Sequence, residues 1–97
     1  MDLAEPDAEV VDNPAASRFE LTVDGRTALI AYQPMEGGRV FVHTEVPQAL
    51  EGRGVGGRLV KGALEQMRAR GLKVRPDCPF VRGWLDRHPG YEDLITG

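Results

Sequence analysis

Alternating apolar and polar residues in the first half of the chain predict three β-strands. We expect them over residues 18–23, 26–34 and 39–46, with Pro47 ending the third. Asp24-Gly25 is a strong signal for a tight hairpin turn between the first two strands. In the third strand, simple alternation places one set of side chains on each face of the sheet. These sets are Val40, Val42, Thr44 and Val46 on one face, and Phe41, His43 and Glu45 on the other.

The second half of the chain changes to a helical pattern. Apolar residues recur every three or four positions from about Gly54 or Val55 to Arg70, and Gly71 is suitably placed to end that helix. A short strand over residues 72–75, a proline-rich bend and a second short helix beginning near Phe80 complete the pattern. The predicted order is β-β-β-α-β-α, an α+β fold with a mostly antiparallel sheet.

The N-terminal residues 1–16 contain two prolines, several acids and few apolar side chains. We expect a flexible tail there, followed by one domain over residues 17–97. The net charge of −3 favours neither a nucleic acid nor a membrane partner. The single cysteine, the absence of a signal-like start and the lack of a long apolar run lead us to expect a cytoplasmic protein.

A glycine-rich segment, Glu51-Gly-Arg-Gly-Val-Gly-Gly-Arg-Leu-Val60, directly precedes the main helical pattern. Such a loop exposes unpaired backbone N–H groups at a helix N-terminus, where a phosphate or pyrophosphate can bind. Arg53 and Arg58 add positive charge to the segment. The alternative interpretation is a glycine-rich turn without a ligand.

Two well-known phosphate loops do not fit this segment. The spacing Gly52-x-Gly54-x-x-Gly57 matches a dinucleotide fingerprint, with Asp77 at a suitable distance, but the preceding strands predict an antiparallel meander instead of a βαβ unit. A Walker A loop requires Gly-Lys-Ser or Gly-Lys-Thr, whereas this chain has Gly57-Arg58-Leu59.

Four segments together resemble a known family. They are His43-Thr-Glu-Val-Pro47, the glycine-rich segment, Val74-x-Pro76-x-Cys78-Pro-Phe-Val81, and Trp84-x-x-x-His88-Pro-x-Tyr91. In this combination the chain resembles the GCN5-related N-acetyltransferase (GNAT) superfamily, and especially its small, single-domain YjdJ-like branch. The resemblance covers roughly residues 19–95.

The resemblance implies binding of acetyl-CoA and transfer of its acetyl group to an amine. It implies that the loop holds the CoA pyrophosphate and that the end of the third strand pairs with the pantetheine amides. The implied cofactor-binding residues are Val46, Arg53, Gly54, Val55, Gly56, Gly57 and Arg58. Glu51 departs from the family pattern, which often has Gln or Arg at that position. The acceptor implied is a small-molecule amine or a protein lysine.

Acetyl transfer needs loss of a proton from the acceptor, polarisation of the thioester carbonyl, and alignment of the two reacting groups. Cys78 could form an acetyl-cysteine intermediate, could act as an acid toward the CoA thiolate, or could be a small buried residue. His43 is a candidate base because its ordinary pKa lies near neutrality, and Glu45 is the alternative base, directly or through water. For both, an ordinary surface role remains open.

The remaining candidate residues have mainly structural interpretations. We interpret His88 mainly as a capping or packing residue, and Phe80, Trp84 and Tyr91 mainly as core aromatics. The two histidines and single cysteine match no metal-site spacing, so we expect no metal. We expect a monomer or weak dimer. The alternative to an enzyme is a non-catalytic CoA-binding or protein-interaction module with the same fold.

Overall fold

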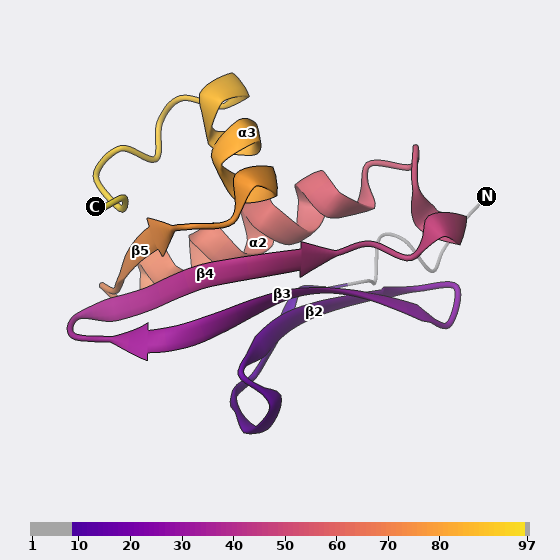
Figure 1. Ribbon diagram of the computed structural model, residues 1–97, viewed down its shortest axis with the longest axis horizontal. Helices are drawn as coiled ribbons and strands as arrows, with labels where there is room; N and C mark the ends of the chain where they lie inside the picture. The colour runs from indigo at the N-terminus through magenta and orange to yellow at the C-terminus, as the bar shows by residue number, and fades with distance from the viewer. Residues whose placement is uncertain (1–8, 97) are drawn as a thin grey trace.

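The computed structural model describes residues 9–96, which form one five-stranded sheet and two α-helices (Figure 1). The strands lie in the sequential order β1-β2-β3-β4-β5, antiparallel except for the parallel pair β4 and β5. The predicted α+β fold is therefore confirmed. The elements are β1 (Val11–Asn13), 3₁₀ helix η1 (Pro14–Ala16), β2 (Arg18–Val23), β3 (Arg26–Met35), β4 (Gly38–Glu45), 3₁₀ helix η2 (Gln48–Leu50), α2 (Val55–Ala69), β5 (Lys73–Pro76) and α3 (Pro79–Arg87).

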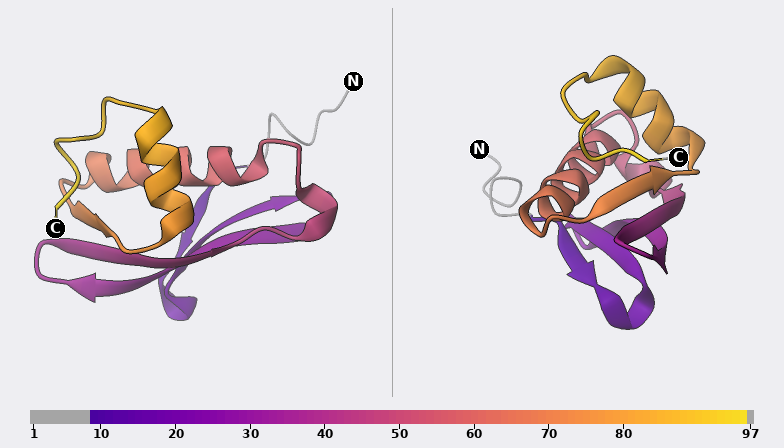
Figure 2. Two further views of the ribbon diagram at one scale, coloured as in Figure 1. Left: turned by 45° about the horizontal axis from the view of Figure 1, so that its top comes forward. Right: turned by 90° about the vertical axis from the view of Figure 1, so that its left-hand side faces the viewer.

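Helix α2 lies along one face of the sheet, and α3 packs beside it next to β4 and β5 (Figure 2). The apolar residues of α2 that recur at helical spacing are all buried in the core. They meet inward-facing residues of the strands, including Phe19, Ile30 and Phe41. None of the helices within residues 9–96 is long and apolar enough to cross a membrane.

The predicted turn at Asp24-Gly25 is confirmed as a two-residue hairpin between β2 and β3. Both residues adopt left-handed backbone angles, with φ of 52° and 75°. This is the geometry of a type I′ turn, whose twist matches that of the flanking strands. Asp and Gly tolerate it better than most residues, which explains why the sequence signal was reliable.

The C-terminus of α2 also follows the sequence prediction. Gly71 has φ of 69°, and its N–H donates to the carbonyl of Arg68, while the N–H of Leu72 donates to the carbonyl of Met67. These two bonds define a Schellman motif, which satisfies carbonyls that the helix end leaves open. The chain thereby reverses direction and enters β5 at Lys73.

The expected N-terminal tail is wrong for residues 11–16, which form β1 and η1; residues 1–8 lie outside the described residues. The Asp12 carboxylate, only 7% exposed, explains the difference. It accepts hydrogen bonds from Tyr32 (2.5 Å), Arg39 (2.9 Å) and Arg70 (2.6 Å). One acidic residue thus ties β1 to β3, β4 and the end of α2, and a count of apolar residues could not reveal it.

The predicted alternation along β4 is also wrong at one point. Tyr32 of β3 pairs with Phe41, but the preceding Ala31 pairs with His43, so Val42 is an extra residue in a β-bulge. Phe41 consequently lies in the core instead of sharing a face with His43 and Glu45. The bulge leaves Val42 exposed.

Candidate functional site

The parallel pairing between β4 and β5 stops before β4 does. Their register runs from Gly38 opposite Lys73 to Phe41 opposite Pro76. One more backbone bond joins the N–H of Cys78 to the carbonyl of Phe41, at 2.9 Å, before the chain turns into α3. Strand β4 continues to Glu45 with no partner from β5, so an edge of the sheet opens at this point.

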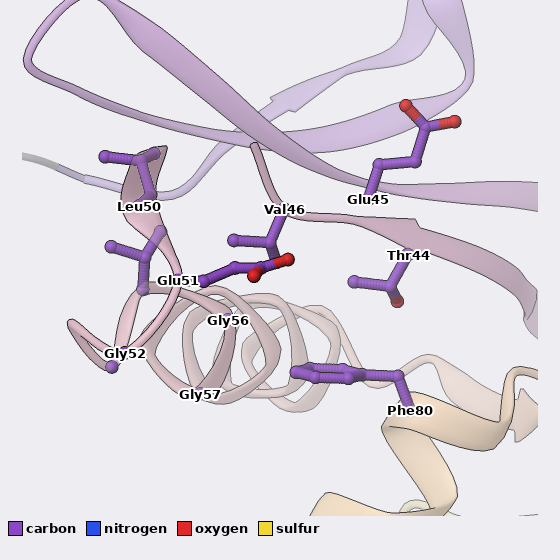
Figure 3. A pocket seen from close by; sticks show the side chains of 11 residues that line it. Thr44, Glu45, Val46, Leu50, Glu51, Gly52, Gly56, Gly57 and Phe80 are labelled. Carbon is purple, nitrogen blue, oxygen red and sulfur yellow. The ribbon is translucent and has the colours of Figure 1, made fainter. Parts of the chain in front are cut away.

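A cleft with a volume of about 770 Å³ lies next to the open end of β4 (Figure 3). Its wall is formed by the end of β4, the glycine-rich loop, the N-terminus of α2 and the first turn of α3. The lining residues are Thr44, Glu45, Val46, Leu50, Glu51, Gly52, Gly54, Val55, Gly56, Gly57 and Phe80. The cleft is therefore built mainly from the continuous stretch 44–57, with Phe80 added from α3.

The N-terminus of α2 supplies backbone N–H groups to the cleft. Gly54 precedes the helix in a left-handed conformation, with φ of 75°, and the first intrahelical bond runs from the N–H of Arg58 to its carbonyl. The N–H groups of the intervening residues have no carbonyl to reach within the helix. Within residues 9–96, no side chain caps them. An anion in the cleft could accept hydrogen bonds from these N–H groups. It would also lie at the positive end of the helix dipole.

Gly56 keeps this part of the cleft open. A Cβ atom at this position would lie 2.6 Å from Cζ of Phe80 and 3.3 Å from a methyl carbon of Val46. A larger residue at this position would therefore displace the tip of the Phe80 ring. Phe80 is 43% exposed at the cleft wall, so its interpretation as mainly a core aromatic was wrong.

The two arginines of the loop do not line the cleft. The guanidinium of Arg53 donates to the Asp24 carboxylate at 2.8 Å, and Arg58 lines a separate hollow beside Lys61. The charged residues at the cleft, among those that the structure describes, are Glu45 and Glu51, and only Glu51 extends its side chain into it (Figure 3). The positions of the two arginines therefore do not support the expectation that both add positive charge at the ligand. The backbone N–H groups of the loop do face the cleft, as phosphate binding requires.

Cys78 is buried beside the cleft and does not line it. The residue is 3% exposed, and its sulfur lies 3.2 Å from the hydroxyl oxygen of Thr44. Thr44 does line the cleft, and Figure 3 shows its side chain on the side that faces Phe80. A ligand in the cleft would therefore contact Thr44 before it could reach the Cys78 thiol.

His43 and Glu45 form a hydrogen-bonded pair on the opposite face of β4. The Nε2 atom of His43 lies 2.8 Å from a carboxylate oxygen of Glu45, and both side chains are more than half exposed. In Figure 3 the Glu45 carboxylate points away from α2, whereas Thr44 and Val46 point toward it. The end of β4 thus presents the His–Glu pair on one face and the cleft on the other.

His88 has the packing role that its sequence context indicates. Its ring stacks on Trp84 with centroids 3.9 Å apart, and its Nδ1 atom lies 2.8 Å from the Trp84 carbonyl oxygen. The ring of Tyr91 also packs against Trp84, with the ring centroids 5.5 Å apart. Asp77, the neighbour of Cys78, is paired with Arg75; their hydrogen bond lowers the pKa of the Asp77 carboxyl.

Thr44 and Leu50 also line the cleft, and the sequence did not assign either to the site. Thr44 lines the cleft because the bulge at Val42 sets the orientation of the strand end, and no local sequence signal announces that bulge. Leu50 lines it because η2 folds back from Pro47. Within residues 9–96, no group of three or more His, Cys, Asp or Glu side chains is arranged to hold a metal ion.

Comparison with known proteins agrees with the geometry. A family model described as GCN5-related N-acetyl-transferase matches residues 18–94. The solution structure of a GCN5-like candidate N-acetyltransferase from Staphylococcus aureus superposes with a TM-score of 0.69 at 28% sequence identity. The superposition covers 92% of this chain and 88% of the other. Comparison with curated protein sequences gives no significant match.

Proposed function

Because the chain belongs to the GCN5-related N-acetyltransferase family, we propose that it binds acetyl-CoA in the cleft and transfers the acetyl group to an amine. The observation that carries this proposal is the open edge of β4 next to the uncapped N-terminus of α2. The proposed donor-binding residues are Val46 and the segment Arg53–Arg58, which acts through its backbone.

The cleft has two features that suit the two ends of CoA. The N–H groups that begin α2, with glycines that allow close approach, suit a pyrophosphate. The unpaired edge of β4 offers backbone groups to the amides of a pantetheine arm, in the manner of an added strand. Gly56 supports the fit of CoA to the cleft, because a side chain at this position would occupy the space between Val46 and Phe80.

The acceptor would approach from the face of β4 that carries His43 and Glu45. An amine must lose a proton before its nitrogen attacks the thioester carbonyl. With the proton of Nε2 donated to Glu45, the Nδ1 atom of His43 has a lone pair that can accept this proton. We therefore assign His43 as the base and Glu45 as the residue that orients it and stabilises its charged form.

Departure of the CoA thiol is the second proton transfer. As the C–N bond forms and the C–S bond breaks, the sulfur must receive a proton. That proton comes from the attacking nitrogen, which loses it on becoming the amide nitrogen. We assign to the Thr44 hydroxyl a hydrogen bond that stabilises the departing thiolate, and a positioning role to Cys78, whose thiol contacts that hydroxyl at 3.2 Å. Burial of Cys78 argues against a covalent acetyl-cysteine, which would require direct access to the thioester.

The acceptor class and the cellular context complete the proposal. The acceptor is an amine, either a small molecule or a protein lysine, that can reach the exposed His–Glu pair. The proposed chemistry needs no metal. We also propose that the protein acts in the cytoplasm as a monomer or weak dimer, without nucleic-acid or membrane partners.

A second candidate is a CoA-binding module without transferase activity. Two observations favour it: Cys78 is buried, and the charged residues at the cleft, within residues 9–96, are both acidic. Such a protein would hold CoA but would not accelerate transfer.

Native mass spectrometry with acetyl-CoA, followed by an amine panel, tests both candidates. The panel should contain polyamines, small primary amines and lysine peptides, with product detected by mass. Retained CoA and an acetylated amine support the enzyme. Retained CoA without product for any amine supports the binding module, and absence of a CoA complex overturns both.

A further inference from the structure

The charge of the cleft is unusual for a site proposed to bind a polyanion. CoA carries several negative phosphate charges, yet the charged residues at the cleft, among those described, are two glutamates, of which Glu51 extends its side chain into it. Arg53 is engaged by Asp24, and Arg58 belongs to another hollow. The backbone of the loop must therefore bind phosphate against nearby negative charge.

Glu51 is the carboxylate placed to act on the phosphates. It lines the same cavity as Gly54, Gly56 and Gly57, whose segment begins α2. Figure 3 shows the Glu51 side chain extending into the cleft, whereas Glu45 points away from it. Helix α2 has no acidic residue in its own first turn, so Glu51 is the carboxylate of the cleft that faces this helix end.

We propose that Glu51 is a specificity-determining residue that lowers the affinity of the cleft for the phosphate end of CoA. This inference rests on the proposed function. A carboxylate near a helix N-terminus reduces the positive potential that an incoming anion would meet. It also repels that anion directly, and the repulsion is strongest at low ionic strength. Donors that lack phosphate do not experience this repulsion.

The direct test is the Kd of CoA for Glu51→Gln, measured by isothermal titration calorimetry at low and high salt. The substitution keeps the size of the side chain and removes its charge. We expect CoA to bind about three- to tenfold more tightly at low salt, the range expected for one exposed charge interaction or a few acting together. The gain should shrink as salt is added.

Two matched variants separate a local effect from a change in net charge. Glu36→Gln removes the same charge from the exposed turn between β3 and β4, at the other end of the sheet from the loop (Figure 1). It should leave the CoA affinity unchanged. Glu51→Asp keeps the charge and should resemble the wild type more closely than Glu51→Gln does.

Acetyl-pantetheine provides a probe without the pyrophosphate. Its KM should be the same for the wild type and Glu51→Gln, while the KM for acetyl-CoA falls in the variant. An unchanged or weaker CoA affinity in Glu51→Gln would overturn the role of Glu51 while leaving the proposed function intact. Failure of both the wild type and the variant to bind CoA would instead overturn the proposed function.

Discussion

The sulfur of Cys78 lies 3.2 Å from the hydroxyl oxygen of Thr44, and of these two residues only Thr44 lines the cleft. The relationship separates two mechanisms that the sequence left open. A nucleophilic cysteine must reach the thioester, whereas a positioning cysteine needs only to hold the hydroxyl.

The first prediction concerns this pair. Thr44→Val should lower kcat about 10- to 100-fold, because it removes the hydrogen bond to the departing thiolate while keeping the shape of the side chain. Cys78→Ala should lower kcat less, and neither variant should change the KM for acetyl-CoA by more than about twofold. Steady-state kinetics with the best amine of the panel measures both constants.

Peptide mapping after incubation with acetyl-CoA provides the control for this prediction. We expect no acetyl group on Cys78. An acetyl group on Cys78 that passes to an amine, together with an inactive Cys78→Ala and an active Thr44→Val, would establish covalent catalysis instead.

The second prediction concerns the narrow approach at Gly56. Gly56→Ala should displace the Phe80 ring into the cleft and weaken CoA binding about tenfold, since the added Cβ would lie 2.6 Å from Cζ of Phe80. Phe80→Ala in the same protein should restore most of the affinity, because it removes the group that clashes. Calorimetric titration of the two single variants and the double variant measures the coupling.

Gly62→Ala is a matched control for this prediction. It makes the same change in the same helix, but the added atom meets Val10, away from the cleft. A similar loss of CoA affinity in Gly56→Ala and Gly62→Ala would mean that distortion of the helix, and not narrowing of the cleft, is responsible.

The third prediction tests the base. His43→Gln should lower kcat about 100-fold while the KM for acetyl-CoA stays within about twofold, because His43 does not line the cleft and pairs with Glu45, whose carboxylate points away from it. The rise of kcat with pH that a base produces should disappear in this variant. Gln33→Ala, at an exposed position of β3, is the control and should retain the wild-type profile. Equal pH profiles for His43→Gln and the wild type would eliminate His43 as the base.

The fourth prediction concerns the Asp12 cluster and the dependence of stability on pH. Burial alone would raise the pKa of Asp12, but hydrogen bonds from Tyr32, Arg70 and Arg39 outweigh it and hold this pKa below its ordinary value. Burial and the bond to Asp12 raise the pKa of Tyr32 to about 12. A carboxyl whose pKa is lower in the folded state stabilises the fold above its unfolded pKa and loses this effect as the pH falls through the folded pKa.

Asp12→Asn should therefore destabilise the protein by about 2 kcal/mol at pH 7, the range for hydrogen bonds to a charged group. The difference from the wild type should shrink as the pH falls below about 4. Urea denaturation at several pH values measures it, with the exposed Asp86→Asn as control. A difference that stays constant down to pH 2 would show that the charge of Asp12 does not contribute.

Much of the fold could be predicted because local chemistry determines it. Asp24-Gly25 suits a type I′ turn, Gly71 ends α2, and the apolar spacing from Val55 to Met67 matches one buried helix face. In each case the residues that carry the signal are neighbours in the sequence. The glycines of the loop belong to the same class, because the left-handed angles of Gly52 and Gly54 are a local requirement.

The features that escaped prediction depend on contacts between distant residues. Strand β1 is held by Asp12 through partners up to 58 positions away, and the bulge at Val42 becomes evident only from the pairing of β3 with β4. The guanidinium of Arg53 likewise pairs with the distant Asp24. The ring of Phe80 lies next to Gly56, which is also far from it in the sequence. The positions of these side chains therefore could not be inferred without the structure, whereas the glycine-rich loop that lines the cleft is evident from the sequence.

The most direct test of the account is a titration of ¹⁵N-labelled protein with acetyl-CoA, followed by NMR of the backbone amides. The account predicts the largest shift changes at Gly54, Gly56 and Gly57, which begin α2, and at Val46 at the end of β4. Unchanged amides at these positions up to millimolar acetyl-CoA would contradict it. So would changes confined to the separate hollow lined by Arg82 and His88.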